Sequence, residues 1–479
     1  MHSQFRKQWI SILLLACLLG GTVMAVASAR GQVLDAFGEA LTPETVAELG
    51  LGGQAEEALA AGQNLPLAID AMLQKAAERA MVEKCASSPA AAVVVMDMQG
   101  RVLAMADHQR GGVPQAISAS GVPGYTLRPL AVLAALAAGH LHPEETISEE
   151  GLFDQYDREN PLTCWIAPEQ RYRHQHQSYP NALANGCDFF FYTIGERLGV
   201  EGLAELGRAM GLEGPSGLGL DGEEMGILAG PKALYNPDLP LDQQETACPA
   251  QVQAALVAHL REQAIAGGVT VTEDALVACA NALMRMAVEN SQTEWVSLIR
   301  EVSGQQLGLP QAVLLTKALI EPVYDQLSRI RWGGNQTALA AAGWSLTRVT
   351  PIAMARYWAA LGNGGYLYPA SLLRKDAYAP VADFSGRLGV YLPMLQEGLR
   401  GWVDVTGESA KALRGWDFRD DIAGMTSTAK GESGPATWAT TLFPWNEPEI
   451  AVAVLIGEED KTATATRIMM QMVDEYVKK

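Results

Sequence analysis

Apolar residues follow a helical spacing early in the chain and a strand-like run directly after it. From Leu65 they recur every three or four positions, which predicts an amphipathic helix through Ala68, Met72, Leu73, Ala76 and Ala80. Residues 91–96 are continuously apolar and predict a buried strand, and 101–105 predict a returning strand after a turn at 97–100. The two strands therefore form a hairpin. A shorter helical pattern, roughly 42–59, precedes them.

The middle of the chain has a helical pattern. Residues 127–138 carry very little polar surface, which predicts a buried helix, and 179–198 predict a second apolar helix. A further short helix follows Gly199 and ends near Gly211. Between about 237 and 335, amphipathic patterns with little strand character predict a helical insertion, with helices at 250–264, 272–288, 294–302 and 312–330.

Strand character returns at the end of the chain. Three strands are predicted, at 421–430, 436–443 and 450–456, and a helix at 462–476 closes the sequence. Strands at both ends with helices between them indicate an antiparallel sheet covered by helices, which is an α+β architecture.

The length and composition of the chain indicate the size of its core and the partners that its charge disfavours. With 479 residues, 48% of them hydrophobic, the chain has enough apolar surface for one large core or two ordinary ones. A net charge of −19 disfavours nucleic acid and anionic lipid as partners, because like charges repel. Of six cysteines, Cys17 lies in the leader and five remain, so at least one is unpaired and no complete disulfide framework is predicted.

The amino terminus indicates an extracytoplasmic protein. Arg6 and Lys7 precede an uncharged, mostly apolar run over 9–29, which is long enough to span a bilayer and ends in a signal-peptidase-like Ala-Ser-Ala at 27–29. Secretion with cleavage and an uncut membrane anchor both remain open. A lipobox-like 14–17 ranks third, because the apolar run continues past its cysteine.

Seven segments resemble those of the class B penicillin-binding proteins and occur in the same order. They are similar to the family's RG segment, first helix, first hairpin, S-x-x-K, S-x-N, TP…NGG and K-T-G regions, and lie at 30–35, 65–76, 93–105, 123–130, 181–198, 350–365 and 423–429. The resemblance implies a β-lactamase/transpeptidase-like fold. It also implies a division into a leader (1–29), a short remnant of the amino-terminal region (30–64) and a transpeptidase-like domain (65–479) that carries the insertion.

The resemblance places changed residues at the first motif. In the family the S-x-x-K serine attacks a D-Ala-D-Ala stem peptide or a β-lactam, and the lysine is commonly assigned as base. Here Tyr125 stands at the serine position, with a phenol that titrates near 10. Arg128 stands at the lysine position, and a guanidinium with a pKa above about 12 does not serve as a general base.

The other two motifs are changed as well. At S-x-N, Gly186 supplies no hydroxyl, and Asp188 replaces an amide donor with a group that, when ionised, only accepts. At K-T-G, Met425 removes the cation, Ser427 replaces the glycine, and Thr426 alone is kept. The resemblance also suggests a hypothesis, that Arg128 and Asp188 form a bidentate ion pair across the site.

Two family features use only the backbone and are expected to persist. They are an oxyanion hole from the N–H groups of Tyr125 and Thr428, and strand pairing of a peptide along 425–429. The predicted peptide-binding residues are therefore Tyr125, Thr426, Ser427 and Thr428.

No cofactor and no metal site are expected. His174 and His176 are metal-ligand types, but in the sequence they stand without nearby carboxylates or cysteines, which favours a polar loop.

The expected function is that of a cell-envelope pseudoenzyme. It binds peptidoglycan stem peptide or a cell-wall synthesis protein, with non-covalent binding of a β-lactam at the same place. Two alternatives stay open: an active D,D-transpeptidase or carboxypeptidase with displaced catalytic residues, and a purely structural role.

Overall fold

The computed structural model describes residues 31–51, 59–109, 112–166, 173–374, 378–404, 408–431, 434–458 and 460–478. The expected leader at 1–29 lies outside the described residues. Among the helices of the described part, none is long and apolar enough to cross a membrane.

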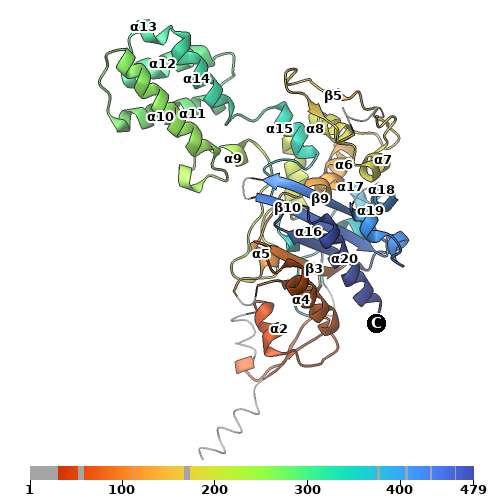
Figure 1. Ribbon diagram of the computed structural model, residues 1–479. Helices are drawn as coiled ribbons and strands as arrows, with labels where there is room; N and C mark the ends of the chain where they lie inside the picture. The colour runs from red at the N-terminus through yellow and green to blue at the C-terminus, as the bar shows by residue number, and fades with distance from the viewer. Residues whose placement is uncertain are drawn as a thin grey trace, which may run out of the picture.

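A five-stranded antiparallel sheet forms the centre of the molecule (Figure 1). Its spatial order is β4-β3-β11-β10-β9, built from β3 (Ala91–Asp97), β4 (Val102–Asp107), β9 (Ala423–Gly431), β10 (Gly434–Phe443) and β11 (Ile450–Ile456). The amino-terminal hairpin therefore joins the carboxyl-terminal meander where β3 pairs with β11, at Val93↔Val454. The predicted strands and hairpin are confirmed.

Both faces of the sheet are buried, and residues of β3 alternate between them. Ala92, Val94 and Met96 belong to one core, while Ala91, Val93 and Val95 belong to the other. This is the period-two alternation of a strand with helices on both sides. The α+β prediction is confirmed.

Different helices cover the two faces. On one face lie α4 (Ala71–Cys85) and the terminal α20 (Thr462–Val477), and on the other lie α6 (Arg128–Ala137), α8 (Asp188–Ala209) and α16 (Pro351–Gly362). Asp70 caps α4 by accepting from the backbone N–H groups of Met72 and Leu73. The helix therefore begins at Ala71, later than the apolar spacing from Leu65 predicted.

Three further predicted helices differ from the structure. The helix expected over 312–330 is two, α13 (Gln311–Leu314) and α14 (Lys317–Ser328). The expected helix over 179–198 is two helices, α7 (Tyr179–Asn185) and α8, because Gly186 ends α7 in the left-handed region with φ +63°. Gly199 then interrupts α8 with a non-helical backbone, as predicted. The pattern at 42–59 gives only the short α2 (Pro43–Glu48), and 52–58 lie outside the described residues.

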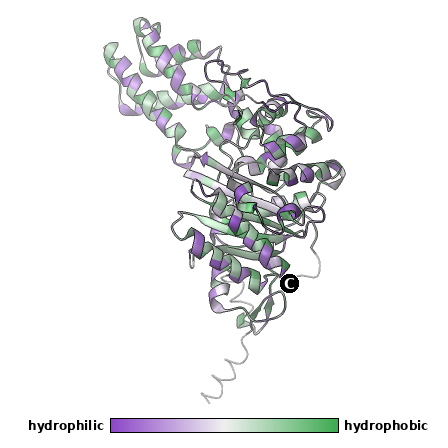
Figure 2. Cartoon of the chain, turned by 45° about the vertical axis from the view of Figure 1, so that its right-hand side comes forward, coloured by the Kyte–Doolittle hydropathy of each residue, from purple (hydrophilic) through white to green (hydrophobic). Residues whose placement is uncertain are grey.

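A helical lobe projects from the sheet domain (Figure 1). It contains α10 (Cys248–Ala266), α11 (Glu273–Glu289), α12 (Trp295–Leu307), α13 (Gln311–Leu314) and α14 (Lys317–Ser328). These helices enclose a core of their own around Trp295. Figure 2 shows hydrophilic and hydrophobic residues side by side along them, as expected of amphipathic helices.

The remaining described elements are short. They are β1 (Val33–Leu34), β2 (Leu65–Pro66), α5 (Gln115–Ser118), η1 (Gly124–Leu127), β5 (Leu152–Phe153), β6 (Leu162–Thr163), α9 (Pro231–Leu234), η2 (Leu241–Gln243), α15 (Gly334–Ala341), β7 (Tyr366–Leu367), β8 (Ala382–Asp383), α17 (Ser385–Leu388), α18 (Leu392–Gly401), η3 (Trp402–Asp404), α19 (Glu408–Leu413) and η4 (Arg419–Asp421).

Candidate functional site

The three segments that resemble the S-x-x-K, S-x-N and K-T-G regions meet where η1 and the start of α6 lie against the edge strand β9. Tyr125 lies in η1, and Arg128 begins α6 directly after it. Asp188 begins α8 beside them, and Met425 to Thr428 lie on β9. The fold thus brings together three segments that are distant in the sequence.

Arg128 and Asp188 form an ion pair inside this site. Nη2 of Arg128 donates to Oδ1 of Asp188, and the side chains are 0% and 6% exposed. The predicted ion pair is therefore present, but the bidentate geometry is wrong. Nε of Arg128 instead donates to the carbonyl oxygen of Ala342 at 3.1 Å.

The second carboxylate oxygen of Asp188 is held by a neighbouring loop. The backbone N–H of Trp165 donates to Oδ2 at 3.0 Å, and the indole N–H of Trp344 donates to Oδ1 at 3.4 Å. Asp188 is therefore fixed from three directions. Neither tryptophan was predicted to belong to the site, because neither lies within a motif.

Aromatic rings enclose the guanidinium. The Cζ atom of Arg128 lies 3.7 Å from the ring centroid of Tyr125 and 4.5 Å from that of Phe191. The Tyr125 ring also meets Trp344 edge-on, with centroids 5.1 Å apart. These contacts stabilise the cation on its π faces and exclude water from it.

Burial and neighbouring charges shift the pKa values of Tyr125 and Arg128. Burial raises the pKa of Tyr125 well above its ordinary value near 10, so its phenol is neutral at physiological pH. Burial opposes the charge of Arg128, but Asp188 and Tyr125 outweigh it and raise the Arg128 pKa further. The site thus holds a neutral phenol beside a guanidinium cation.

Ser427 occupies the place expected for an oxyanion hole. The backbone N–H of Tyr125 donates to Oγ of Ser427 at 3.0 Å. A Cβ atom on Gly124 would lie 1.9 Å from that same oxygen, so the serine hydroxyl fills the space above the helix start. The expectation that both backbone donors stay available is wrong for Tyr125, because the residue replacing the motif glycine satisfies its N–H.

The remaining motif residues are also engaged within the protein. Gly186 faces the Tyr125 ring, since a Cβ atom there would lie 3.3 Å from Cε2 of Tyr125. Met425 is 1% exposed. The hydroxyl of Thr426 lies 2.5 Å from that of Ser409, and the hydroxyl of Thr428 lies 2.9 Å from that of Thr437.

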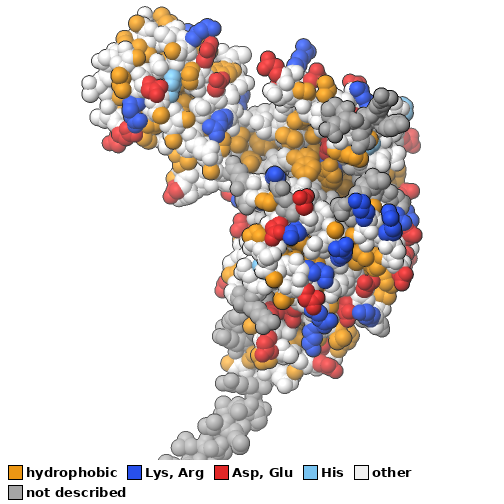
Figure 3. All heavy atoms as spheres, viewed as in Figure 1, with side chains coloured by type: hydrophobic (Ala, Val, Ile, Leu, Met, Phe, Trp, Pro, Cys, Tyr) orange, Lys and Arg blue, Asp and Glu red, His pale blue; other side chains and the backbone are white. Residues whose placement is uncertain are grey.

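Two recesses lie along β9, one on each side of the Arg128–Asp188 ion pair. The first, with a volume of about 210 Å³, is lined by Tyr125, Trp165, Gly186, Trp402, Met425 and Thr426, among others. The second, of about 340 Å³, lies where the segments that lead into and out of the helical lobe approach the end of β9, with Trp332, Trp344, Arg348 and Lys430 among its lining. Figure 3 shows hydrophobic side chains gathered in the hollow beside the lobe. The first is smaller than the roughly 300–1,000 Å³ of typical ligand pockets.

The fold also brings together potential metal ligands that stand apart in the sequence. His174 lies with Glu149, Cys164 and Cys187, and their ligand atoms are all within 4.8 Å of one another. The expectation that His174 has no carboxylate or cysteine nearby is therefore wrong, because residues that are distant in the sequence lie close together in the fold. His176 contacts Ser148 instead, with Nδ1 3.4 Å from its hydroxyl.

Comparisons with protein-family models and with solved structures both find penicillin-binding proteins. The family model described as penicillin-binding protein transpeptidase domain matches residues 90–256 and 323–474, about two thirds of the chain. A comparison with curated proteins finds no match.

Among solved structures, Pseudomonas aeruginosa PBP2 in complex with WCK 5153 is 17% identical, with 93% of this chain and 96% of that chain covered and a TM-score of 0.60. Helicobacter pylori PBP2, in complex with MreC, is 15% identical, with 87% and 64% covered and a TM-score of 0.57. The D,D-transpeptidase domain of a peptidoglycan glycosyltransferase from Eggerthella lenta is 15% identical, with 94% and 98% covered and a TM-score of 0.58. The chain thus spans less than two thirds of the Helicobacter protein, and these likenesses concern the fold.

Proposed function

The chain belongs to the penicillin-binding protein transpeptidase family, and from that premise we propose that it is a non-acylating member that acts in the cell envelope by binding a cell-wall synthesis protein. The observation that carries the proposal is the buried Arg128–Asp188 ion pair at the former catalytic centre. An arginine fixed by Asp188 and Ala342 has no free lone pair with which to activate a nucleophile.

The surroundings of the ion pair support the same conclusion. Acyl transfer needs a nucleophile next to a base, and N–H donors aimed at the developing oxyanion. Tyr125 has a raised phenol pKa and an arginine beside it. Its N–H, the donor expected for the oxyanion, is bonded to Ser427. Nucleophile, base and oxyanion donor are thus all replaced or used internally.

The helical lobe offers the surface that we assign to the partner. A groove of about 320 Å³ lies on it, lined by Val296, Leu315, Ile320 and Tyr324 among others. Leu315 is 64% exposed and Val296 37% exposed, so apolar side chains at the rim are left in water. Exposed apolar rims of this kind are typical of protein interaction sites. That a solved relative, Helicobacter pylori PBP2, was captured with MreC supports a protein as the class of partner.

Binding of a stem peptide is the second mode that we consider. β9 is an edge strand, and an extended peptide adds to such an edge through backbone hydrogen bonds. Thr426, Ser427 and Thr428 would receive it, as would a non-covalently bound β-lactam. The internal contacts of Ser427 and the small recess beside Tyr125 weigh against this mode.

The proposal includes an arrangement of the whole chain. Membership of a family that works on peptidoglycan supports a position outside the cytoplasm, where the domain would be either anchored by residues 1–29 or released after their cleavage. We assign residues 30–64 to a short remnant of the amino-terminal region and 237–335 to an insertion in the transpeptidase-like domain.

Photo-crosslinking in cells tests the docking surface. A crosslinking amino acid at Leu315 should trap one protein of the cell-wall synthesis machinery, whereas the same residue at Ile265 should not. Ile265 is the matched control because it is 72% exposed, lies in the same lobe and does not line the groove. Equal crosslinking at both positions, or none at Leu315, would contradict the proposal. Saturable binding of a D-Ala-D-Ala peptide by the purified chain in that case would favour the stem-peptide mode.

A further inference from the structure

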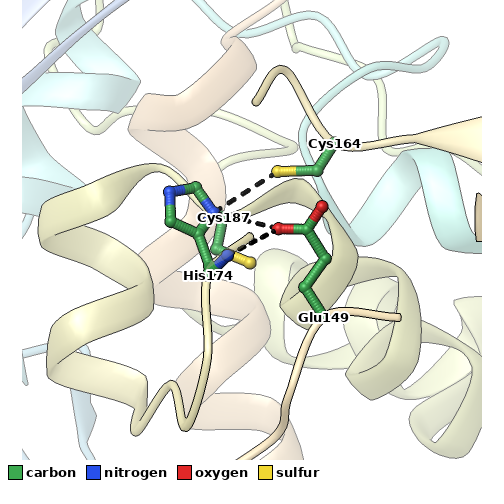
Figure 4. Close-up of side chains that lie close together, drawn as sticks. All are labelled: Glu149, Cys164, His174 and Cys187. Atoms are coloured by element: carbon green, nitrogen blue, oxygen red, sulfur yellow. Dashed lines mark hydrogen bonds and ion pairs between the residues drawn. The ribbon is translucent and has the colours of Figure 1, made fainter. Parts of the chain in front are cut away.

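Four side chains of metal-ligand type lie close together (Figure 4). Glu149 lies in a loop, Cys164 directly follows β6, His174 precedes α7, and Cys187 lies between α7 and α8. Their ligand atoms are all within 4.8 Å of one another. All four residues are buried or nearly so, with exposed fractions of 4%, 0%, 9% and 1% in that order.

Two separations within this cluster agree with those of a tetrahedral zinc site. Bond lengths of about 2.3 Å to sulfur and about 2.0–2.2 Å to nitrogen and oxygen place tetrahedral ligands about 3.6 Å apart for a sulfur–nitrogen pair and about 3.4 Å for a nitrogen–oxygen pair. Here Sγ of Cys164 lies 3.6 Å from Nδ1 of His174, and that nitrogen lies 3.3 Å from Oε2 of Glu149. Both separations agree with a shared ion.

A buried polar atom without a partner points to a ligand. Oε1 of Glu149 is buried and has no hydrogen-bond partner among the described residues, although Oε2 accepts from the backbone N–H of His174 at 3.1 Å. A buried carboxylate oxygen left alone costs free energy. An ion held between the four side chains would compensate the charge on this carboxylate.

The chemistry of the ligand set selects the metal. Two sulfurs, one imidazole nitrogen and one carboxylate oxygen suit Zn²⁺, whereas Ca²⁺ and Mg²⁺ take oxygen ligands. Four protein ligands close the coordination sphere, which is the arrangement of a structural site and not of a catalytic one. Both cysteines are free thiols in the structure, so neither sulfur is consumed by a disulfide.

The cluster is connected to the ion pair through the backbone on two sides. Cys187 immediately precedes Asp188, and Cys164 immediately precedes Trp165, whose backbone N–H donates to Oδ2 of Asp188 at 3.0 Å. An ion bound to both cysteines would therefore hold the two segments that position this carboxylate.

We propose that Glu149, Cys164, His174 and Cys187 bind one structural Zn²⁺, and that the bound ion fastens the loop carrying Trp165 to the start of α8, so that Asp188 stays aligned with Arg128. The proposal does not depend on which partner the protein binds. It makes the alignment of Asp188 with Arg128 dependent on the metal.

Metal analysis of the full chain tests the ligand set. The chain, purified under reducing conditions without chelator and exposed to ZnSO₄ before desalting, should retain one equivalent of zinc. Cys187→Ser should lose it, and Cys248→Ser should keep it. Cys248 is the matched control because it lies in the helical lobe, away from the cluster. No zinc in the native chain, or full zinc in Cys187→Ser, would overturn the proposal.

Two measurements on the native chain keep the test independent of variant folding. Replacing the zinc with Co²⁺ should give the intense visible bands of a tetrahedral site and a thiolate charge-transfer band; bands of an octahedral ion would overturn the assignment. The intact mass after purification without reductant shows whether the two thiols form a disulfide instead of binding zinc. A Cys164–Cys187 disulfide, seen as the loss of two hydrogens that zinc loading does not prevent, would also overturn it.

Hydrogen exchange tests the link to the ion pair. Removing the ion with a chelator should increase exchange at the Trp165 amide by tenfold or more, and adding zinc back should restore protection. The amide of Val94, in the centre of the sheet, serves as internal reference. Unchanged exchange at Trp165 on removal of the ion would overturn the coupling even if zinc is bound.

Discussion

Arg128 and Asp188 are joined by an ion pair that is withdrawn from solvent, with side chains 0% and 6% exposed. By resemblance to the family, Arg128 stands at a position of the S-x-x-K motif and Asp188 at a position of S-x-N, so residues of two separate segments meet in a single contact. Buried charges are tolerated where they are paired and hydrogen-bonded, and here Ala342, Trp165 and Trp344 provide the additional partners.

Breaking one side of this pair should cost more stability than replacing both sides. Asp188→Asn leaves a buried guanidinium without its counter-charge, for an expected loss of about 3–5 kcal/mol in the free energy of unfolding. The double change Arg128→Met/Asp188→Leu removes both charges and should cost less than Asp188→Asn alone. Urea unfolding of the three proteins measures this, and a double variant less stable than the single one would contradict the prediction.

The hydrogen bond between Ser427 and Tyr125 should be detectable at the backbone. Ser427→Ala removes the acceptor, so the Tyr125 amide should exchange with solvent about tenfold faster, the effect of a lost hydrogen bond of ordinary strength. Thr426→Val, which removes the neighbouring hydroxyl that contacts Ser409 instead, should leave that amide unchanged. Equal exchange in the two variants would argue against Ser427 as the occupant of the oxyanion position.

An alanine should be tolerated far less at Gly343 than at Gly139, a glycine that also has a positive φ but faces open space. Gly343 has φ +91°, and a Cβ atom there would lie 2.0 Å from the carbonyl oxygen of Gly124. Gly139 has φ +74° with nothing within 4 Å. Both alanine variants pay for the left-handed backbone, but Gly343→Ala should lose about 1–3 kcal/mol more from the overlap. Similar unfolding free energies would show that η1 is not held close to Gly343.

Tyr125 should titrate later than ordinary tyrosines. Burial raises its pKa above the unfolded value near 10, so the folded state keeps the phenol proton longer. The resulting stabilisation is complete below about pH 10 and is lost as the pH rises through the folded pKa. Subtracting the ultraviolet titration of Tyr125→Phe from that of the native chain should therefore show no phenolate at pH 10. A difference that titrates at or below pH 10 would contradict the buried, neutral phenol.

The sequence predicted the sheet well, because its strands depend on local signals. Apolar runs such as 91–96 are long enough to define strands, and the Pro-Gly-Tyr-Thr-Leu-Arg segment carries the family's spacing unchanged. The break between α7 and α8 was missed, because Gly186 reads as an isolated glycine in an apolar helix until its φ of +63° is known.

Contacts between distant segments could not be predicted in the same way. Ser427 lies 302 positions from Tyr125, and the geometry that brings its hydroxyl to one N–H depends on the close approach of β9 to Gly124. The single-contact form of the ion pair follows from Ala342, which accepts from Nε and so turns the guanidinium away from a bidentate position. The metal-ligand cluster likewise depends on how the loops fold back, which no spacing rule encodes.

The central claim is that the chain forms no acyl-enzyme, and intact-mass measurement after exposure to benzylpenicillin tests it most directly. The native chain should keep its mass under conditions in which an acylating penicillin-binding protein is fully labelled, and Tyr125→Phe should behave identically. A native mass increased by one penicillin, with the increase absent in Tyr125→Phe, would show that Tyr125 acts as a nucleophile and would contradict the account.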